Sequence, residues 1–282
     1  MNSRVLIIVG MHRSFTSLVS QWLQSCGLRI GQKLFPGDIG NIQGHFEDSD
    51  FLELHKQLLK NRNMPWTGFV NTPIGRLTNK EKELLCNLID TKNRESAEWG
   101  WKDPRTCLFL TEYGQALPYA YYLIVIRNFN ETVNSLIARE FKMHNQRFKT
   151  KKGLSRLKWL LYKKKSENFF YKKFSEPYLK VWIHYYEQII QHLQALPLTR
   201  FFVIHYSYLL ANDEKVFSYL NDEWLFSLNY ISFKKIYKEN LLSDKKDIAP
   251  YIKDAKLLEK ALRIEKTIGN YFTLTSLYNT CN

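Results

Sequence analysis

The chain has 282 residues, of which 45% are hydrophobic and 15% are aromatic. This is ample material for a large core, which excludes a disordered, collagen-like or low-complexity protein. The formal net charge is +14, but residues 142–173 hold twelve Lys or Arg residues and a single acid, Glu167. The positive charge therefore describes one segment and not the whole chain.

Targeting signals and metal motifs are not visible in the sequence. No apolar run approaches the ~18 residues that span a bilayer. The first apolar run begins at residue 4 without a preceding basic region, so it predicts a strand and not a signal peptide. The cysteines show neither CxxC nor Cys/His metal spacing, and they are Cys26, Cys86, Cys107 and Cys281. We expect reduced thiols, no metal site and a cytoplasmic location.

The first predicted elements are a strand, a turn and a helix. Residues 4–9 (RVLIIV) are apolar after Arg4 and rich in β-branched side chains, as in a strand buried on both faces. A turn containing Gly10 follows, and apolar residues at helical spacing then predict a helix that ends near Gly27. Further helices are predicted at 47–60 and 79–90.

Strands and helices alternate along the rest of the chain. Strands are predicted at 98–101, 121–126 and 201–205. Helices are predicted at 130–141, 176–195 and 255–268. Apolar strands alternating with helices predict an α/β fold with a mostly parallel sheet covered on both faces. We expect a single domain over residues 1–282, with a helical basic insertion at about 142–175 and C-terminal helices.

The turn after the first strand has the features of an anion site. It begins with Gly10 and leads into a helix, so backbone N–H groups and the positive end of the helix dipole gather there. Aligned to GxxxxGK[ST], it has Phe15 for the second Gly, Thr16 for the Lys and Ser17 for the final hydroxyl. Without that Lys, a nucleotide triphosphatase or small-molecule kinase is disfavoured. Arg13 is the cation of this loop, and an ordinary polar turn is the alternative interpretation.

A second group of polar residues follows the strand at 121–126. Arg127 comes directly after the strand, Ser135 lies two helical turns further on, and Arg139 one turn beyond. Open parallel sheets bind ligands at the carboxyl ends of their strands. A surface ion pair is the alternative for Arg127 alone. Together with the first loop, these residues predict one ligand held at two neighbouring strand ends.

Three segments together resemble the sulfotransferases that use 3′-phosphoadenosine 5′-phosphosulfate (PAPS), especially the bacterial, carbohydrate and tyrosylprotein types. They are HRSFTS at 12–17, KDPR at 102–105 and RNFNETVNS at 127–135. The resemblance covers residues 4–140 and extends loosely to 201–210. It implies a P-loop-like sheet and PAPS as co-substrate, with adenosine 3′,5′-bisphosphate as product.

The resemblance also implies which residues bind this co-substrate. In the family the first loop, commonly RSGT[ST], holds the 5′-phosphosulfate. This corresponds to Arg13, Ser14, Phe15, Thr16 and Ser17. An Arg and a Ser eight residues apart bind the 3′-phosphate, which corresponds to Arg127 and Ser135.

Cations near the transferred group are implied in the same way. The Lys of a KDP motif acts there in tyrosylprotein relatives, which corresponds to Lys102, and Arg13 is the second candidate. Asp103 is expected to orient Lys102 and the adjacent backbone. A sulfuryl group carries one negative charge where a phosphoryl group carries two, so Arg, Lys and N–H groups suffice without a metal.

For the general base, the resemblance implies a Glu soon after the first helix, which corresponds to Glu47. The alternative for Glu47 is an acid in the first turn of a helix, where the dipole makes it worth ~0.3–1 kcal/mol. His45 and His12 are the other candidate bases.

The sequence departs from the family at three places. Phe15 stands where the family commonly has Gly, so either the loop has adapted to the ring or the activity is weakened. The Lys- and Gly-rich 3′-phosphate motif found late in cytosolic relatives is not visible. Residues 142–173 resemble a family-variable insertion.

Four interpretations of the basic stretch remain open. It interleaves its cations with Phe148, Trp159, Tyr162, Phe169, Phe170 and Tyr171. It is a flap recruiting an anionic acceptor such as an acidic glycan, a face touching anionic lipid, a nucleic-acid surface, or a solvated helical insertion. We favour the acceptor flap, because the stretch follows the helix of Ser135 and no nucleic-acid module is visible.

The favoured hypothesis is an enzyme that transfers a sulfuryl group from PAPS to a hydroxyl group of a carbohydrate or other small-molecule acceptor. One rival is a PAPS- or nucleotide-binding module without catalysis, which Phe15 favours. The other is a nucleic-acid-binding protein that uses the basic stretch.

Overall fold

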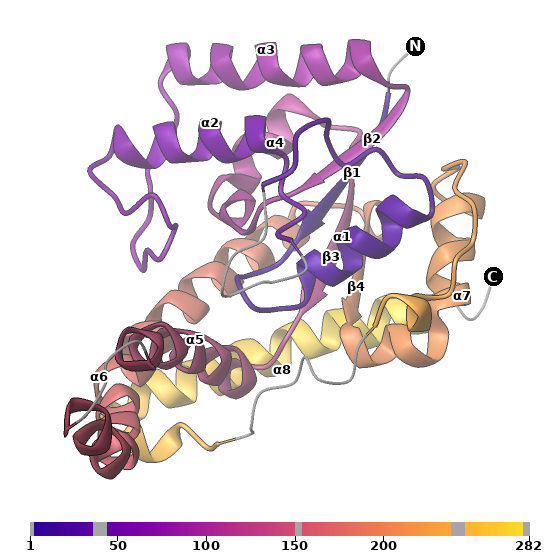
Figure 1. The fold of residues 1–282 in the computed structure, drawn as a ribbon. Coiled ribbons are helices and arrows are strands. Elements are labelled where there is room, and N and C mark those ends of the chain that lie inside the picture. Colours follow the sequence, from indigo (N-terminus) through magenta and orange to yellow (C-terminus); the bar gives the residue numbers. More distant parts are fainter. Residues whose placement is uncertain (1–2, 36–43, 150–153, 238–245, 279–282) are drawn as a thin grey trace.

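A parallel sheet forms the centre of the protein (Figure 1). The computed structural model describes residues 3–35, 44–149, 154–237 and 246–278. The strand order is β2-β1-β3-β4, with every neighbouring pair parallel. The strands are β1 (Arg4–Val9), β2 (Glu98–Lys102), β3 (Tyr121–Ile126) and β4 (Phe201–His205). Because the strands are parallel, the loops that follow them lie at one edge of the sheet.

Both faces of the sheet are buried, because successive side chains of each strand enter opposite cores. Val5, Ile7 and Val9 lie in one hydrophobic core, and Leu6 and Ile8 lie in the other. The smaller core is covered by α1 (Thr16–Ser25) and α7 (Tyr206–Asp222). The larger core is covered by α2 (Ser49–Lys60), α3 (Asn79–Glu95), α4 (Leu110–Ala116), α5 (Phe129–Lys149), α6 (Leu154–Gln194) and α8 (Ala255–Tyr278). The predicted α/β fold with a covered parallel sheet is confirmed.

The predicted helix at 47–60 begins later than expected. The carboxylate of Asp48 accepts the backbone N–H of Asp50, so Asp48 is the N-cap and α2 begins at Ser49. Glu47 therefore precedes the helix. Glu47 lies directly before the N-cap and not in the first turn, so the alternative of a first-turn acid is wrong for Glu47, and Asp50 is the acid of that turn.

The described residues of the basic stretch belong to two helices, α5 and α6. Figure 1 shows α5 and the first part of α6 side by side, extending away from the sheet. Phe170 packs against Phe141 and Phe174, with 5.5 Å between ring centroids in each pair. Some aromatic residues of the stretch therefore join the two helices. Tyr162 and Phe169 are exposed, whereas the side chains of Phe148 and Trp159 lie outside the described part.

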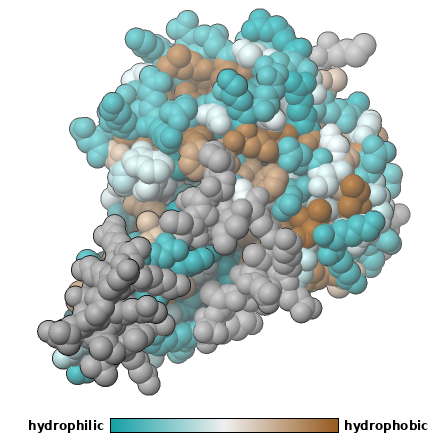
Figure 2. All heavy atoms as spheres, viewed as in Figure 1, coloured by the Kyte–Doolittle hydropathy of each residue, from teal (hydrophilic) through white to brown (hydrophobic). Residues whose placement is uncertain are grey.

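The helix predicted at 176–195 is the second half of α6, which is 41 residues long and contains Pro177. The apolar pattern after this proline is regular, whereas the cations before it obscure the helical period. None of the helices in the described ranges has the length and apolar character needed to cross a membrane. The view in Figure 2 shows a largely hydrophilic face with smaller groups of hydrophobic residues between.

The cysteines of the described residues are unbridged. Cys26 and Cys107 are buried and Cys86 is exposed, and burial raises the pKa of the Cys107 thiol to about 12. Cys281 lies outside the described residues. The cytoplasmic location inferred from cysteine usage stays a prediction.

Candidate functional site

The candidate site residues lie where three neighbouring strands end. Residues 13–17 follow β1, Lys102 is the last residue of β2, and Arg127 directly follows β3. In the register of the sheet Ile8 lies opposite Lys102, so the ends of β1 and β2 are level. The parallel order brings these residues to one edge, as expected for a ligand site of an open α/β sheet.

Arg13, Ser135 and Arg127 form one connected group. The Nε of Arg13 donates to the Oγ of Ser135 at 2.9 Å, across 122 positions of the chain. The Nη1 of Arg127 donates to the backbone carbonyl of Arg13 at 2.7 Å, and its Nε donates to Glu131 at 3.1 Å. Arg127 is only 4% exposed. The two polar groups expected on separate strands are thus in direct contact.

Phe15 adopts the backbone conformation that glycine would favour. Its φ is 66°, in the left-handed region, and the φ of Arg13 is 67°. The ring of Phe15 stacks on Tyr206 with 4.1 Å between centroids, and the guanidinium of Arg127 lies 4.7 Å from the same ring. These contacts counter the ~1–2 kcal/mol that a left-handed residue costs. The bulky side chain is accommodated on the side of the loop that faces Tyr206.

The start of α1 has no side-chain cap. Phe15 is its N-cap and makes no side-chain cap, and its described first turn contains no acidic residue. By helix geometry the first N–H groups, including those of Thr16 and Ser17, have no partner within the helix. The hydroxyl of Ser17 is near the same position. Ser14 is fully buried beneath the loop.

Glu47 and Lys102 form a buried ion pair beside this loop. The Nζ of Lys102 lies 2.8 Å from Oε1 of Glu47 and 3.3 Å from the Oγ of Ser17. The Nη1 of Arg105 lies 3.6 Å from Oε2 of Glu47. Lys102 is 1% exposed and Glu47 is 6% exposed. One lysine therefore touches both the candidate base and the loop after β1.

Asp103 accepts the backbone N–H of Arg105 at 2.8 Å, as expected for the adjacent backbone, but the side-chain cation that it orients is Arg105 and not Lys102. Its two carboxylate oxygens accept from Nη1 of Arg105 at 2.8 and 3.0 Å, and Nδ1 of His55 lies 3.3 Å away. The Nε2 of His55 is hydrogen-bonded to the hydroxyl of Tyr113 at 2.8 Å. Burial alone would raise the pKa of Asp103, but Arg105 and His55 hold it well below its usual range. Asp103 is therefore a buried carboxylate that holds Arg105 toward Glu47.

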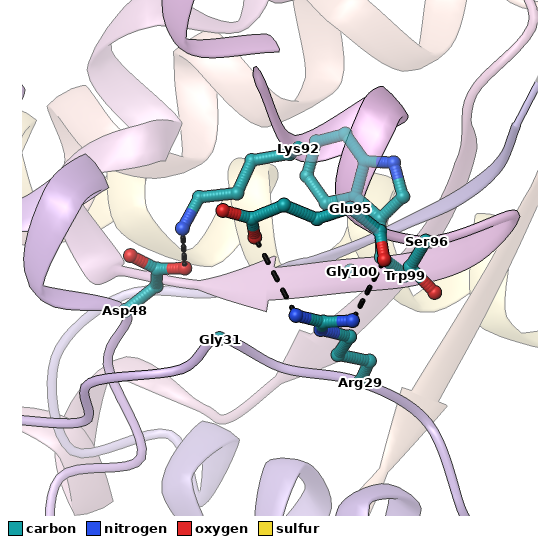
Figure 3. A pocket seen from close by; sticks show the side chains of 8 residues that line it. All are labelled: Arg29, Gly31, Asp48, Lys92, Glu95, Ser96, Trp99 and Gly100. Carbon is teal, nitrogen blue, oxygen red and sulfur yellow. Dashed lines mark hydrogen bonds and ion pairs between the residues drawn. The ribbon is translucent and has the colours of Figure 1, made fainter. Parts of the chain in front are cut away.

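A small pocket is lined by Asp48, the neighbour of Glu47, and ion pairs within it hold this segment of the chain (Figure 3). The Nζ of Lys92 contacts Asp48 at 2.8 Å and Asp50 at 2.6 Å. On the other side, Arg29 lies 3.7 Å from the carboxylate of Glu95. Each cation of the pocket thus faces an acid, so the pocket is not a free anion site. It anchors Asp48, the neighbour of Glu47, to α3.

The two other candidate bases lie close to this group. The Nδ1 of His45 is 4.0 Å from Oε1 of Glu47. The ring of His12 packs against Phe69 at 4.8 Å. Burial, with the nearby charge of Arg105, holds the pKa of His12 well below its ordinary value, so this ring is neutral at pH 7.

Three residues that contribute to the site were not predicted from the sequence. Glu131 binds Arg127, and their i,i+4 spacing on α5 is a signal that could have found it. Arg105 was quoted within KDPR but given no role. Tyr206 packs on Phe15 from the end of β4, and no sequence pattern indicates that contact.

The protein is an α/β domain with a cationic site at the carboxyl edge of its parallel sheet. The model of the sulfotransferase family matches residues 6–222, which is most of the chain. The chain therefore belongs to the sulfotransferase family, as its motifs predicted.

Similar solved structures are distant in sequence. They include the sulfotransferase domain of the olefin synthase from Synechococcus PCC 7002, with 15% identity, 95% of each chain covered and a TM-score of 0.47. The sulfotransferase domain from the curacin biosynthetic pathway has 13% identity, covers 95% of this chain and 98% of that one, and has a TM-score of 0.46. Sulfotransferase STF9 from Mycobacterium avium has 13% identity, covers 97% and 77%, and has a TM-score of 0.49. No curated protein matches.

Proposed function

We propose that this protein transfers a sulfuryl group from PAPS to a hydroxyl group of a carbohydrate and releases adenosine 3′,5′-bisphosphate. Membership of the sulfotransferase family supports sulfuryl transfer in general. The single observation that carries the finer proposal is the position of Lys102, which contacts both Ser17 and Glu47. Sulfuryl transfer uses positive charge near the leaving oxygen of the donor and a base near the acceptor hydroxyl. Lys102 lies between the loop after β1 and the carboxylate of Glu47, and it can therefore serve the first need beside the group that serves the second.

The residues present fit an anionic nucleotide. PAPS supplies the sulfuryl group and a phosphate leaving group. Arg127 and Ser135 provide a guanidinium and a hydroxyl for one phosphate, and the start of α1 provides N–H groups for the other. Gly10 is required here, because a Cβ at this position would lie 2.6 Å from both Thr16 and the carbonyl of Val125. The close packing keeps the loop tight against the sheet.

The buried pair gives each side chain a distinct task. Lys102 stabilises negative charge that develops on the leaving oxygen, since a fixed cation in a site shielded from water is more effective than solvent. Glu47 accepts the proton of the acceptor hydroxyl at its carboxylate. Arg105 contacts Glu47 directly, and the ion pair between Asp48 and Lys92 fixes the residue next to it, so both help to position Glu47.

Titration with adenosine 3′,5′-bisphosphate tests the donor assignment. We expect calorimetry of the purified protein to show at least ~10-fold tighter binding of the bisphosphate than of ATP, because the loop lacks the P-loop lysine. Transfer of labelled sulfate from PAPS to an oligosaccharide tests the reaction. Equal affinity for ATP, or absence of bisphosphate binding, would contradict the proposal.

A further inference from the structure

The loop between α2 and α3 presents a large exposed ring close to Glu47. Trp66 is 53% exposed, whereas the other tryptophans whose side chains the structure describes are not exposed. Burial of an indole provides much of the binding energy of many protein sites. Two features distinguish Trp66 from other exposed aromatic residues: its backbone is held by hydrogen bonds, and these connect it to Glu47.

The backbone that carries Trp66 is held in place. The Nε of Arg105 donates to the carbonyl of Trp66 at 2.8 Å. Two residues further on, the hydroxyl of Tyr185 donates to the carbonyl of Gly68 at 2.7 Å. Gly68 has φ +78°, and a Cβ there would lie 2.8 Å from the Tyr185 hydroxyl and 2.9 Å from the side chain of Arg105. A ring on a fixed backbone loses little entropy when a ligand packs on it.

The same contacts connect Trp66 to the candidate base. Arg105, which holds the Trp66 carbonyl, lies 3.6 Å from Glu47. A second set of contacts connects Trp66 to the neighbourhood of Glu47. The ring of Phe35 lies 5.0 Å from that of His45, and the Nζ of Lys56 lies 5.9 Å from the Phe35 ring and 5.3 Å from the Trp66 ring. Trp66 and Lys56 are therefore part of a rim beside the carboxylate.

The chemistry of this rim suits a saccharide. A sugar ring has an apolar C–H face and several hydroxyl groups at its edge. The phenol ring of a tyrosine acceptor has only one hydroxyl group. Trp66 offers a flat apolar surface, and Lys56 offers ammonium hydrogens, one of which is used by Glu53 at 2.7 Å. Building on the function proposed above, we propose that Trp66 and Lys56 form the acceptor subsite. A saccharide ring packs on the indole, and Lys56 donates to hydroxyl or carboxylate groups at the ring edge.

Binding measurements on the complex with adenosine 3′,5′-bisphosphate test this subsite. The probes are an N-acetylglucosamine oligosaccharide, a uronate-containing oligosaccharide and a tyrosine peptide, each titrated by calorimetry. Trp66→Ala is expected to weaken binding of at least one oligosaccharide by ~10-fold or more, with bisphosphate affinity unchanged. Trp66→Phe, which keeps a flat ring, is expected to retain most of the affinity.

Tyr119 provides a matched control. It is 64% exposed, and its carbonyl also accepts from an arginine, Arg200, at 2.9 Å, but it precedes β3 at the opposite edge of the sheet. Tyr119→Ala is expected to leave saccharide affinity unchanged. If the wild type does not bind the bisphosphate, the proposed function fails. If bisphosphate binds but Trp66→Ala keeps its saccharide affinity, or the wild type prefers the peptide, the subsite proposal alone is overturned.

Discussion

Replacing Phe15 with glycine tests whether the loop is adapted to its bulky residue. Glycine relieves the left-handed φ of 66°, but it is also more flexible in the unfolded chain, which leaves a gain of roughly 1 kcal/mol. The contacts of the Phe15 ring that the glycine variant loses are worth more than this gain. A half-buried ring is worth ~1 kcal/mol, the stack on Tyr206 ~0.5–1.5 kcal/mol and the contact with Arg127 ~0.5–1 kcal/mol. We expect a net destabilisation of about 1–2.5 kcal/mol.

Urea unfolding followed by tryptophan fluorescence measures this difference. Phe15→Asn is the control, because asparagine tolerates the left-handed region but lacks the ring. It should lose about as much stability as Phe15→Gly. Affinity for adenosine 3′,5′-bisphosphate should fall by ~3-fold or more in both variants, because Arg127 loses the ring beneath its guanidinium. A glycine variant that is more stable and binds more tightly would refute this reasoning and show that strain dominates.

Three further changes test separate parts of the structure. Arg127→Lys keeps the charge but loses the planar guanidinium that reaches both Glu131 and the Arg13 carbonyl. Binding of the bisphosphate, measured by calorimetry, should therefore weaken by ~10-fold or more. Unchanged affinity would remove Arg127 from the site. Glu47→Gln should lower the rate of sulfate transfer by ~100-fold or more with bisphosphate affinity intact, and near-normal turnover would reject Glu47 as the base. The hydrogen bonds from Arg62 lower the pKa of Glu81 from 4.5 to about 2, so Glu81 stabilises the fold above pH 4.5 and loses this effect as the pH falls toward 2. The difference in unfolding free energy between wild type and Glu81→Gln should therefore narrow between about pH 6 and pH 3, and a constant difference would contradict the ion-pair explanation.

The strands could be predicted because a strand buried on both faces appears in the sequence as a short run of apolar residues. β1, β3 and β4 have the predicted bounds, since both faces of each strand are covered and all positions are apolar except Arg4 at the start of β1 and His205 at the end of β4. The start of α2 was not predictable from acid content alone. Either Glu47 or Asp48 could stand before the helix, and only the hydrogen bond from Asp50 to Asp48 decides between them.

The partners of the motif residues required the structure, although one of them follows from strand geometry. Lys102 ends β2, and successive residues of an extended chain point to opposite sides. Asp103 therefore points away from the ammonium of its neighbour, and it binds Arg105 after the chain turns. Sequence adjacency suggested the wrong partner. The contact between Arg13 and Ser135 depends on strand order, which no local pattern specifies.

That contact has a consequence for ligand binding. The Nε of Arg13 donates to a neutral hydroxyl, which is worth about 1 kcal/mol, whereas a phosphate or sulfate oxygen in its place is worth ~1.5–3 kcal/mol. The Ser135 hydroxyl only accepts in this hydrogen bond, so its own hydrogen can be donated to the anion. The backbone of Arg13 need not move, because Arg127 holds its carbonyl. An anion is therefore favoured over the existing hydrogen bond at the expense of one side-chain rotation. This explains how a site with two arginines in contact stays ordered before its ligand binds.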